Sequence, residues 1–119
     1  MTDAPEPDRV RAAREQLAAI HDMLRRDLAA ARRDPRAHCL AFCAALSGHH
    51  GNEDAVFPRI ERAFPQAAPI IARLREDHRR IAGQIAAEPD AATLERMAVE
   101  LEEHFAIEEA ELVPLISRL

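Results

Sequence analysis

The sequence contains no tryptophan or tyrosine, only three glycines and only two cysteines. The absence of tryptophan and tyrosine excludes redox chemistry that depends on a tyrosyl or tryptophanyl radical. Cys39 and Cys43 are four residues apart, a helical spacing at which side chains share a face but rarely form a disulfide. We therefore interpret them as small core residues in a reducing compartment; the alternative is a minor soft-metal or redox site that they form with His38.

No apolar run approaches the roughly 20 residues that a membrane-spanning helix needs. The N-terminal residues MTDAPEPDR have neither a basic region nor an apolar stretch, so we predict no secretion signal and expect a cytoplasmic protein. Acidic residues outnumber basic ones by 21 to 16. This balance argues against nucleic acid or an anionic membrane as the main partner.

Helix-forming residues fill the segments between the prolines. A length of 119 residues with 48% apolar side chains predicts one domain, residues 1–119, with its own core. Alanine, leucine, arginine and glutamate dominate these segments and favour helices, and Asp34-Pro35 has the pattern of a helix cap followed by proline at the first helical position. We predict no strand, a loose N-terminal tail at residues 1–7, and helices at roughly 7–33, 35–63, 67–87 and 91–117.

Each predicted helix carries one apolar seam with heptad spacing. Such seams predict an all-α fold, an antiparallel four-helix bundle with short loops. The fourth seam, for example, consists of Leu94, Met97, Leu101, His104, Glu108 and Leu115. Every seam has one histidine near the middle of its helix, namely His21, His49, His78 and His104.

The chain also contains a hidden repeat. The second helix reads HHGNEDAVFP and the fourth reads HFAIEEAELVP, and each follows a helix with a lone histidine, 28 and 26 residues earlier. The chain is therefore two similar hairpins, each supplying a histidine and then a His-x-x-x-Glu motif. Packing about a pseudo-two-fold axis brings six groups to one level of the bundle: His21, His49, Glu53, His78, His104 and Glu108.

Four histidines and two glutamates at one level predict a site for two metal ions. Residues four apart on a helix lie on one face, with Cβ atoms about 5–6 Å apart, so each motif can direct an imidazole and a carboxylate to one point. Each buried polar group without a partner costs about 1–3 kcal/mol, and six would consume most of a typical stability of about 5–15 kcal/mol. Metal ligation satisfies all six, and this donor set suits iron or manganese, and zinc less strictly.

His50 and Asp54 form a second His-x-x-x-carboxylate frame. His50 lies about 100° around the helix from His49, and the heptad favours the frame of His49 and Glu53. His50 is alternatively an additional ligand or a group that contacts a ligand. Three acidic residues adjoin the predicted histidine ligands and either orient the imidazoles or are solvated surface charges: Asp22, Asp77 and Glu103.

These motifs resemble the hemerythrin-like HHE cation-binding family over about residues 15 to 116. The resemblance rests on His21, a His-x-x-x-Glu motif followed by Phe57-Pro58, the pair Asp77-His78, and His-Phe-x-x-Glu-Glu at residues 104–109. It implies an up-down-up-down bundle with a non-haem di-iron centre, in which an oxo or hydroxo group bridges the two ions. One iron would be held by His21, His49 and Glu53 and the other by His78 and His104, with Glu53 and Glu108 bridging.

One position departs from the oxygen-carrying members of this family, which place two histidines four apart on the third helix. Here the residues four before and four after His78 are Leu74 and Ala82. We therefore expect an open iron position and a redox reaction with oxygen, peroxide or nitric oxide, either peroxide-consuming or oxidase-like. The alternatives are a non-catalytic oxygen- or iron-binding or sensing module and a structural bundle that holds zinc. We expect a monomer or a weak homodimer.

Overall fold

Two aspartates cap the starts of long helices where the sequence predicts them. The Asp34 carboxylate accepts a hydrogen bond from the backbone N–H of Ala37 at 3.3 Å, and Pro35 is the first residue of the helix that follows. The Asp90 carboxylate accepts from the backbone N–H of Thr93 at 2.8 Å. Both bonds satisfy N–H groups that have no partner within the first turn of a helix.

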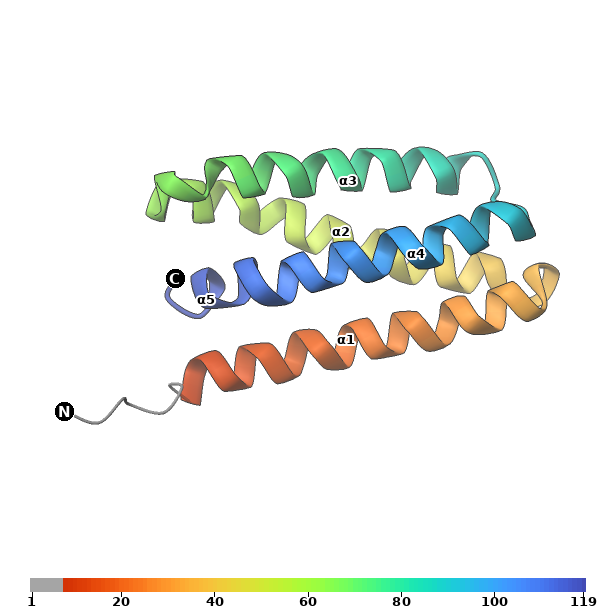
Figure 1. Cartoon of the computed structure of the whole chain (residues 1–119), viewed down its shortest axis with the longest axis horizontal. Helices are drawn as coiled ribbons and strands as arrows, with labels where there is room; N and C mark the ends of the chain where they lie inside the picture. The colour runs from red at the N-terminus through yellow and green to blue at the C-terminus, as the bar shows by residue number, and fades with distance from the viewer. Residues whose placement is uncertain (1–7) are drawn as a thin grey trace.

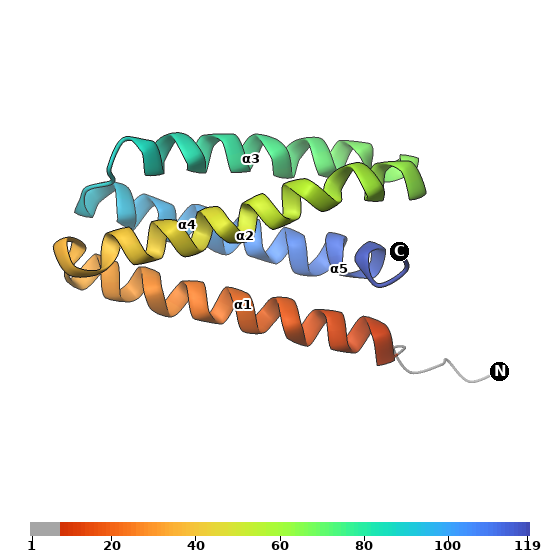
Figure 2. The same ribbon diagram turned by 180° about the vertical axis from the view of Figure 1, so that it is seen from behind.

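The computed structural model describes residues 8–119, so the predicted tail at residues 1–7 lies outside the described part. Four long helices pack antiparallel, as Figures 1 and 2 show from opposite sides, and this confirms the predicted all-α bundle. They are α1 (Asp8–Arg33), α2 (Pro35–Ala63), α3 (Ala68–Ala86) and α4 (Ala91–Ile107), with a 3-10 turn at Pro65–Ala67 between α2 and α3. None of the helices in residues 8–119 is long and apolar enough to cross a membrane.

The core consists of two separate apolar clusters, one toward each end of the bundle. Phe42, Leu46 and Leu101 belong to the cluster near the connection between α1 and α2. Phe57 and Leu74 belong to the cluster near the connection between α2 and α3. On α2, α3 and α4 the predicted ligands lie between residues of the two clusters, so the polar layer is closed above and below by apolar side chains.

The predicted fourth helix is not continuous. A π-helical segment, η2 (Glu108–Leu112), follows α4 and leads into a short helix, α5 (Val113–Ile116). The wider turn changes the helical register, so Leu112 and Val113 are fully buried whereas Leu115, which the heptad placed in the core, is only partly buried against it.

Pro114 ends the π-helical hydrogen bonding, and Arg14 satisfies the carbonyl that is then left without a backbone partner. The N–H of Val113 bonds to the carbonyl of Glu108, five residues earlier, and the next bond in this pattern would join residue 114 to Glu109. Pro114 has no N–H to give. The Glu109 carbonyl instead accepts a hydrogen bond from the Arg14 guanidinium of α1 at 3.0 Å, which ties α1 to the segment that begins with Glu108.

Candidate metal centre

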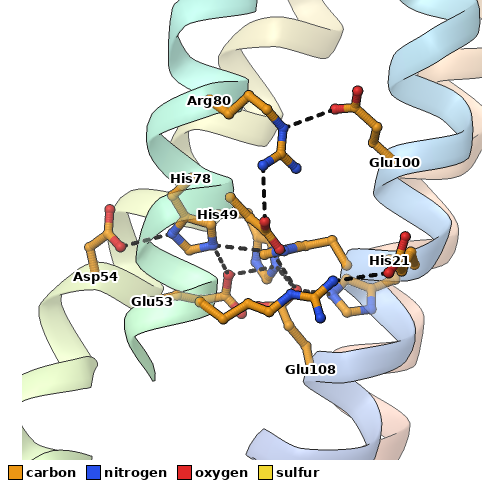
Figure 3. Close-up of polar contacts among 12 residues, drawn as sticks. His21, His49, Glu53, Asp54, His78, Arg80, Glu100 and Glu108 are labelled. Atoms are coloured by element: carbon orange, nitrogen blue, oxygen red, sulfur yellow. Dashed lines mark hydrogen bonds and ion pairs between the residues drawn. The ribbon is translucent and has the colours of Figure 1, made fainter. Parts of the chain in front are cut away.

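All six predicted ligands converge between the two apolar clusters, and a seventh group joins them. The donor atoms form two groups, and within each group they lie within 4.8 Å of one another. One group contains His21 from α1, His49 from α2 and Glu108 from η2; the other contains His50 and Glu53 from α2, His78 from α3 and His104 from α4. Figure 3 shows the labelled donors of α1, α2, α3 and η2 directed toward a common centre: His21, His49, Glu53, His78 and Glu108.

The two adjacent histidines of α2 point to opposite sides of this centre. The His49 ring lies against that of His21, with ring centroids 5.3 Å apart, whereas the His50 ring stacks on that of His78 at 3.9 Å. Successive side chains of a helix point in directions about 100° apart. The centre lies between the directions of His49 and His50, so both imidazoles reach it. The heptad preference for His49 in place of His50 is therefore incomplete, because His50 belongs to one donor group and His49 to the other.

His50 bears on the second histidine that the third helix lacks. The third helix does carry one histidine, and Leu74 is a buried core residue, but α2 supplies two histidines to the centre. The seven donor residues therefore include five histidines. The expectation of an open iron position rested on the third helix alone, and His50 of α2 is a candidate for the additional ligand.

Each inner glutamate reaches histidines of both donor groups. Glu53 Oε1 lies 3.4 Å from His49 Nε2 and 3.3 Å from His78 Nε2. Glu108 Oε1 lies 3.2 Å from His21 Nε2 and 3.3 Å from His104 Nε2. Both carboxylates are therefore placed between the groups, as bridging ligands would be. The family resemblance implied that Glu53 shares an ion with His21 and His49. In the structure Glu53 instead belongs to the donor group of His78 and His104.

Three carboxylates outside the centre contact histidine rings at Nδ1, the nitrogen that faces away from the centre; we call them the outer carboxylates. The Nδ1–H of His78 donates to Asp54 at 2.8 Å, and the Nδ1–H of His104 donates to Asp77 at 3.0 Å. Each bond joins two different helices and directs Nε2 toward the centre, where the Nε2 atoms of His78 and His104 lie 3.2 Å apart. Asp54 thus contacts a ligand histidine and does not itself join a donor group, contrary to the alternative frame that paired it with His50.

The third outer carboxylate is Glu109, which lies 3.3 Å from Nδ1 of His21. Sequence reasoning missed this role, because Glu109 follows a predicted ligand directly and had no assigned partner. The acidic neighbours that it did name behave differently: Asp77 orients His104 and not the adjacent His78, whereas Asp22 and Glu103 bond to Arg25 and Arg73.

Arg80 extends one of these contacts toward solvent. Its guanidinium lies 3.2 Å from the outer oxygen of Asp77 and 3.3 Å from Glu100 of α4, as Figure 3 shows. A chain of charged side chains therefore runs from the exposed surface through Asp77 to His104. It fixes the Asp77 carboxylate, and through it the orientation of the imidazole.

Unpartnered polar atoms provide the test of whether these residues fit a metal. Nε2 of His21, His49 and His50 is buried without a hydrogen-bond partner, and so are all four carboxylate oxygens of Glu53 and Glu108. Their mutual contacts lie within ion-pair distance but do not have hydrogen-bonding geometry. Each such atom costs about 1–3 kcal/mol when left without a partner. Nitrogen and oxygen donors that face one another in this way fit divalent or trivalent metal ions.

Burial also sets the charge of the metal-free centre. Desolvation lowers the pKa of His21 to about 3 and that of His50 to about 2, so both imidazoles are neutral, the form that binds metals. Burial, followed by the nearby charge of Glu53, raises the pKa of Glu108 to about 11. Burial opposes ionisation of Glu53 as well, but contacts with His78 and Glu108 outweigh it and lower its pKa to about 2. One carboxyl is therefore protonated until a cation replaces the proton.

An antiparallel four-helix bundle with buried histidine and glutamate clusters at mid-height is typical of metal-binding bundle proteins, and the two donor groups are consistent with a binuclear site. The chain matches the hemerythrin HHE cation-binding domain over residues 11–116. It belongs to this family, and the match covers nearly all of the described residues. No curated protein and no solved structure shows significant similarity to the chain.

Proposed function

We propose that this protein holds two iron ions in the two donor groups and reacts with a small oxidant, namely oxygen, peroxide or nitric oxide. The observation that carries the proposal is the set of buried imidazole nitrogens and carboxylate oxygens that face one another without partners. Imidazole together with carboxylate is a donor set that suits iron and manganese. When bound, the irons supply the electrons for reducing the oxidant.

The two donor groups are unequal, which supports reactivity at one of them. His50, Glu53, His78 and His104 form a group of four, whereas His21, His49 and Glu108 form a group of three. Iron commonly takes about six ligands, so the smaller group leaves more coordination positions for a small molecule. His21 in this group stacks on Phe105, with centroids 4.0 Å apart, which keeps an apolar wall beside those positions.

The residues of the chain perform three tasks at this centre. Asp54, Asp77 and Glu109 keep the proton of each contacted imidazole on Nδ1, outside the centre. Glu53 and Glu108 balance the cations with two carboxylates that are buried from solvent. The two apolar clusters limit the access of bulk water from either end, which favours small uncharged reactants such as oxygen, nitric oxide and hydrogen peroxide.

Reversible oxygen binding is the second candidate function, and His50 favours it. The third helix lacks the second histidine of the oxygen carriers, but His50 of α2 lies in a donor group and can take its place. A centre with more of its positions occupied by the protein has fewer for exchange. The two candidates are separated by adding oxygen to the reduced protein and then removing it under vacuum. Return of the reduced spectrum indicates a carrier, whereas a stable oxidised spectrum with peroxide consumption indicates an oxidase-like or peroxide-consuming protein.

Metal stoichiometry tests the centre itself. Protein purified without chelators is expected to contain about two iron ions per chain. His49→Ala and His50→Ala remove donors from different groups, so each variant is expected to lose metal, mainly from its own group. His38→Ala is the matched control, because His38 is an exposed histidine of the same helix, and it is expected to keep both ions. One ion or none in the unsubstituted protein, or full loading of both inner variants, contradicts the proposal.

A further inference from the structure

A second group of metal-binding side chains lies away from the histidine centre, near the start of α2. Cys39 and Cys43 are free thiols, the first partly buried and the second buried. Their sulfur atoms are 3.7 Å apart. Cys43, the nearer thiol, lies six positions before His49 in α2, about 9 Å along a helix, so the thiols and the histidine centre cannot share an ion.

Both cysteines line a cavity that opens at this end of the bundle. The cavity has a volume of about 420 Å³. Its wall combines the first turns of α2 with the connection between α3 and α4, and Arg36, Leu40, Ile85 and Glu88 line it together with the two cysteines. A small ion can therefore reach the thiols from solvent without any opening of the core.

The distance between the sulfurs distinguishes a bridging ion from a disulfide. A disulfide needs sulfurs about 2.05 Å apart and Cβ atoms about 3.5–4.5 Å apart, whereas residues four apart on a helix have Cβ atoms about 5–6 Å apart. Oxidation would therefore have to distort α2. An ion with bonds to sulfur of about 2.3 Å spans the observed 3.7 Å at an angle of about 107°, close to tetrahedral.

We propose that Cys39 and Cys43 form a dithiolate site for one thiophilic divalent cation of the zinc class, which enters through the adjoining cavity. Two thiolates provide two soft ligands at tetrahedral spacing, and water from the cavity completes the coordination. Binding converts two thiols and one cation into two metal–sulfur bonds and releases two protons. Burial and the neighbouring Cys39 raise the pKa of Cys43 to about 12, so the Cys43 thiol keeps its proton at neutral pH until the cation arrives.

Cadmium provides a direct test on the protein with its histidine centre already loaded. Thiolate-to-cadmium charge transfer absorbs in the ultraviolet, histidine and carboxylate ligands do not produce this band, and the chain has no tryptophan or tyrosine to obscure it. We expect a difference band that saturates at one equivalent of Cd²⁺, with release of two protons. Bound Cd²⁺ is also expected to protect both thiols from alkylation, as measured by mass spectrometry.

Three variants complete the experiment. Cys39→Ser and Cys43→Ala are each expected to abolish the band, and circular dichroism shows whether they keep their helices. His38→Ala is expected to leave the band unchanged, because His38 is exposed and does not line the cavity. The proposal is overturned by a missing band, by one that needs a large excess of Cd²⁺, or by one that survives either cysteine substitution. It is also overturned if the unsubstituted thiols form a disulfide in air. Alkylation protection requires no variant and so decides the matter if a variant fails to fold.

Discussion

Glu108→Gln is expected to stabilise the metal-free protein and destabilise the metal-bound one. Glu108 is fully buried, and burial together with the charge of Glu53 raises its pKa to about 11, so the metal-free fold holds this carboxyl protonated. The unfolded chain ionises it near pH 4.5. Folding at pH 7 therefore requires uptake of a proton, which costs about 3 kcal/mol. Glutamine has nearly the same shape and needs no proton.

The sign of the pH dependence follows from the same difference in proton binding. Between pH 4.5 and pH 11 the folded metal-free state binds one more proton at Glu108 than the unfolded state does. This group therefore lowers stability as pH rises, by about 1.4 kcal/mol per pH unit. The advantage of the Glu108→Gln variant is expected to be about 3 kcal/mol at pH 7 and below about 1 kcal/mol at pH 5. Contributions from the histidines are common to both proteins and cancel in the comparison.

Chemical denaturation in the presence of a chelator measures this advantage at several pH values. With metal present the order is expected to reverse, because an amide is a weaker ligand than a carboxylate and the variant loses a bridging group. The comparison of melting temperatures with and without metal reveals the reversal. If the metal-free variant is less stable than the parent protein at pH 7, or if its advantage does not shrink toward pH 5, the buried, protonated state assigned to Glu108 is wrong.

Three further results are expected from the same structure. Removal of metal from the unsubstituted protein should lower its melting temperature, because the buried donors of the centre lose their partners; equal melting temperatures with and without chelator would contradict this. Asp77→Asn should weaken metal binding by about 10- to 100-fold in equilibrium titrations, because it disturbs the orientation of His104. Glu103→Gln is the control: it changes only an exposed contact with Arg73 and should leave metal affinity unchanged. Gly51→Ala should raise the stability of the metal-free protein by about 0.5–1 kcal/mol, because an added Cβ meets nothing within 4 Å; a loss in chemical denaturation would refute the reasoning.

Helix capping and the apolar periodicity within each helix were enough to predict the positions of the long helices and six of the donor residues from the sequence alone. The positions of the long helices follow from proline, aspartate caps and helix-forming composition, all of which act within a few residues. The repeated His-x-x-x-Glu motif brings an imidazole and a carboxylate to one face of a helix, whatever the helix packs against. The spacing of the two hairpins then places six of the donors at one level, as the structure does.

Only the tertiary structure decided the roles of residues at the edges of these faces. His50 lies off the heptad seam and becomes a donor because α3 and α4 pack on its side of α2, and Asp54 and Glu109 contact histidines of other helices. The π turn depends in the same way on a distant residue, since Arg14 of α1 satisfies the carbonyl that Pro114 cannot. Helical periodicity identifies the side chains at the middle of each helix's inward face. A site between four helices also includes side chains at the edges of that face. What a flanking side chain meets depends on how neighbouring helices are rotated, and no local pattern contains that information.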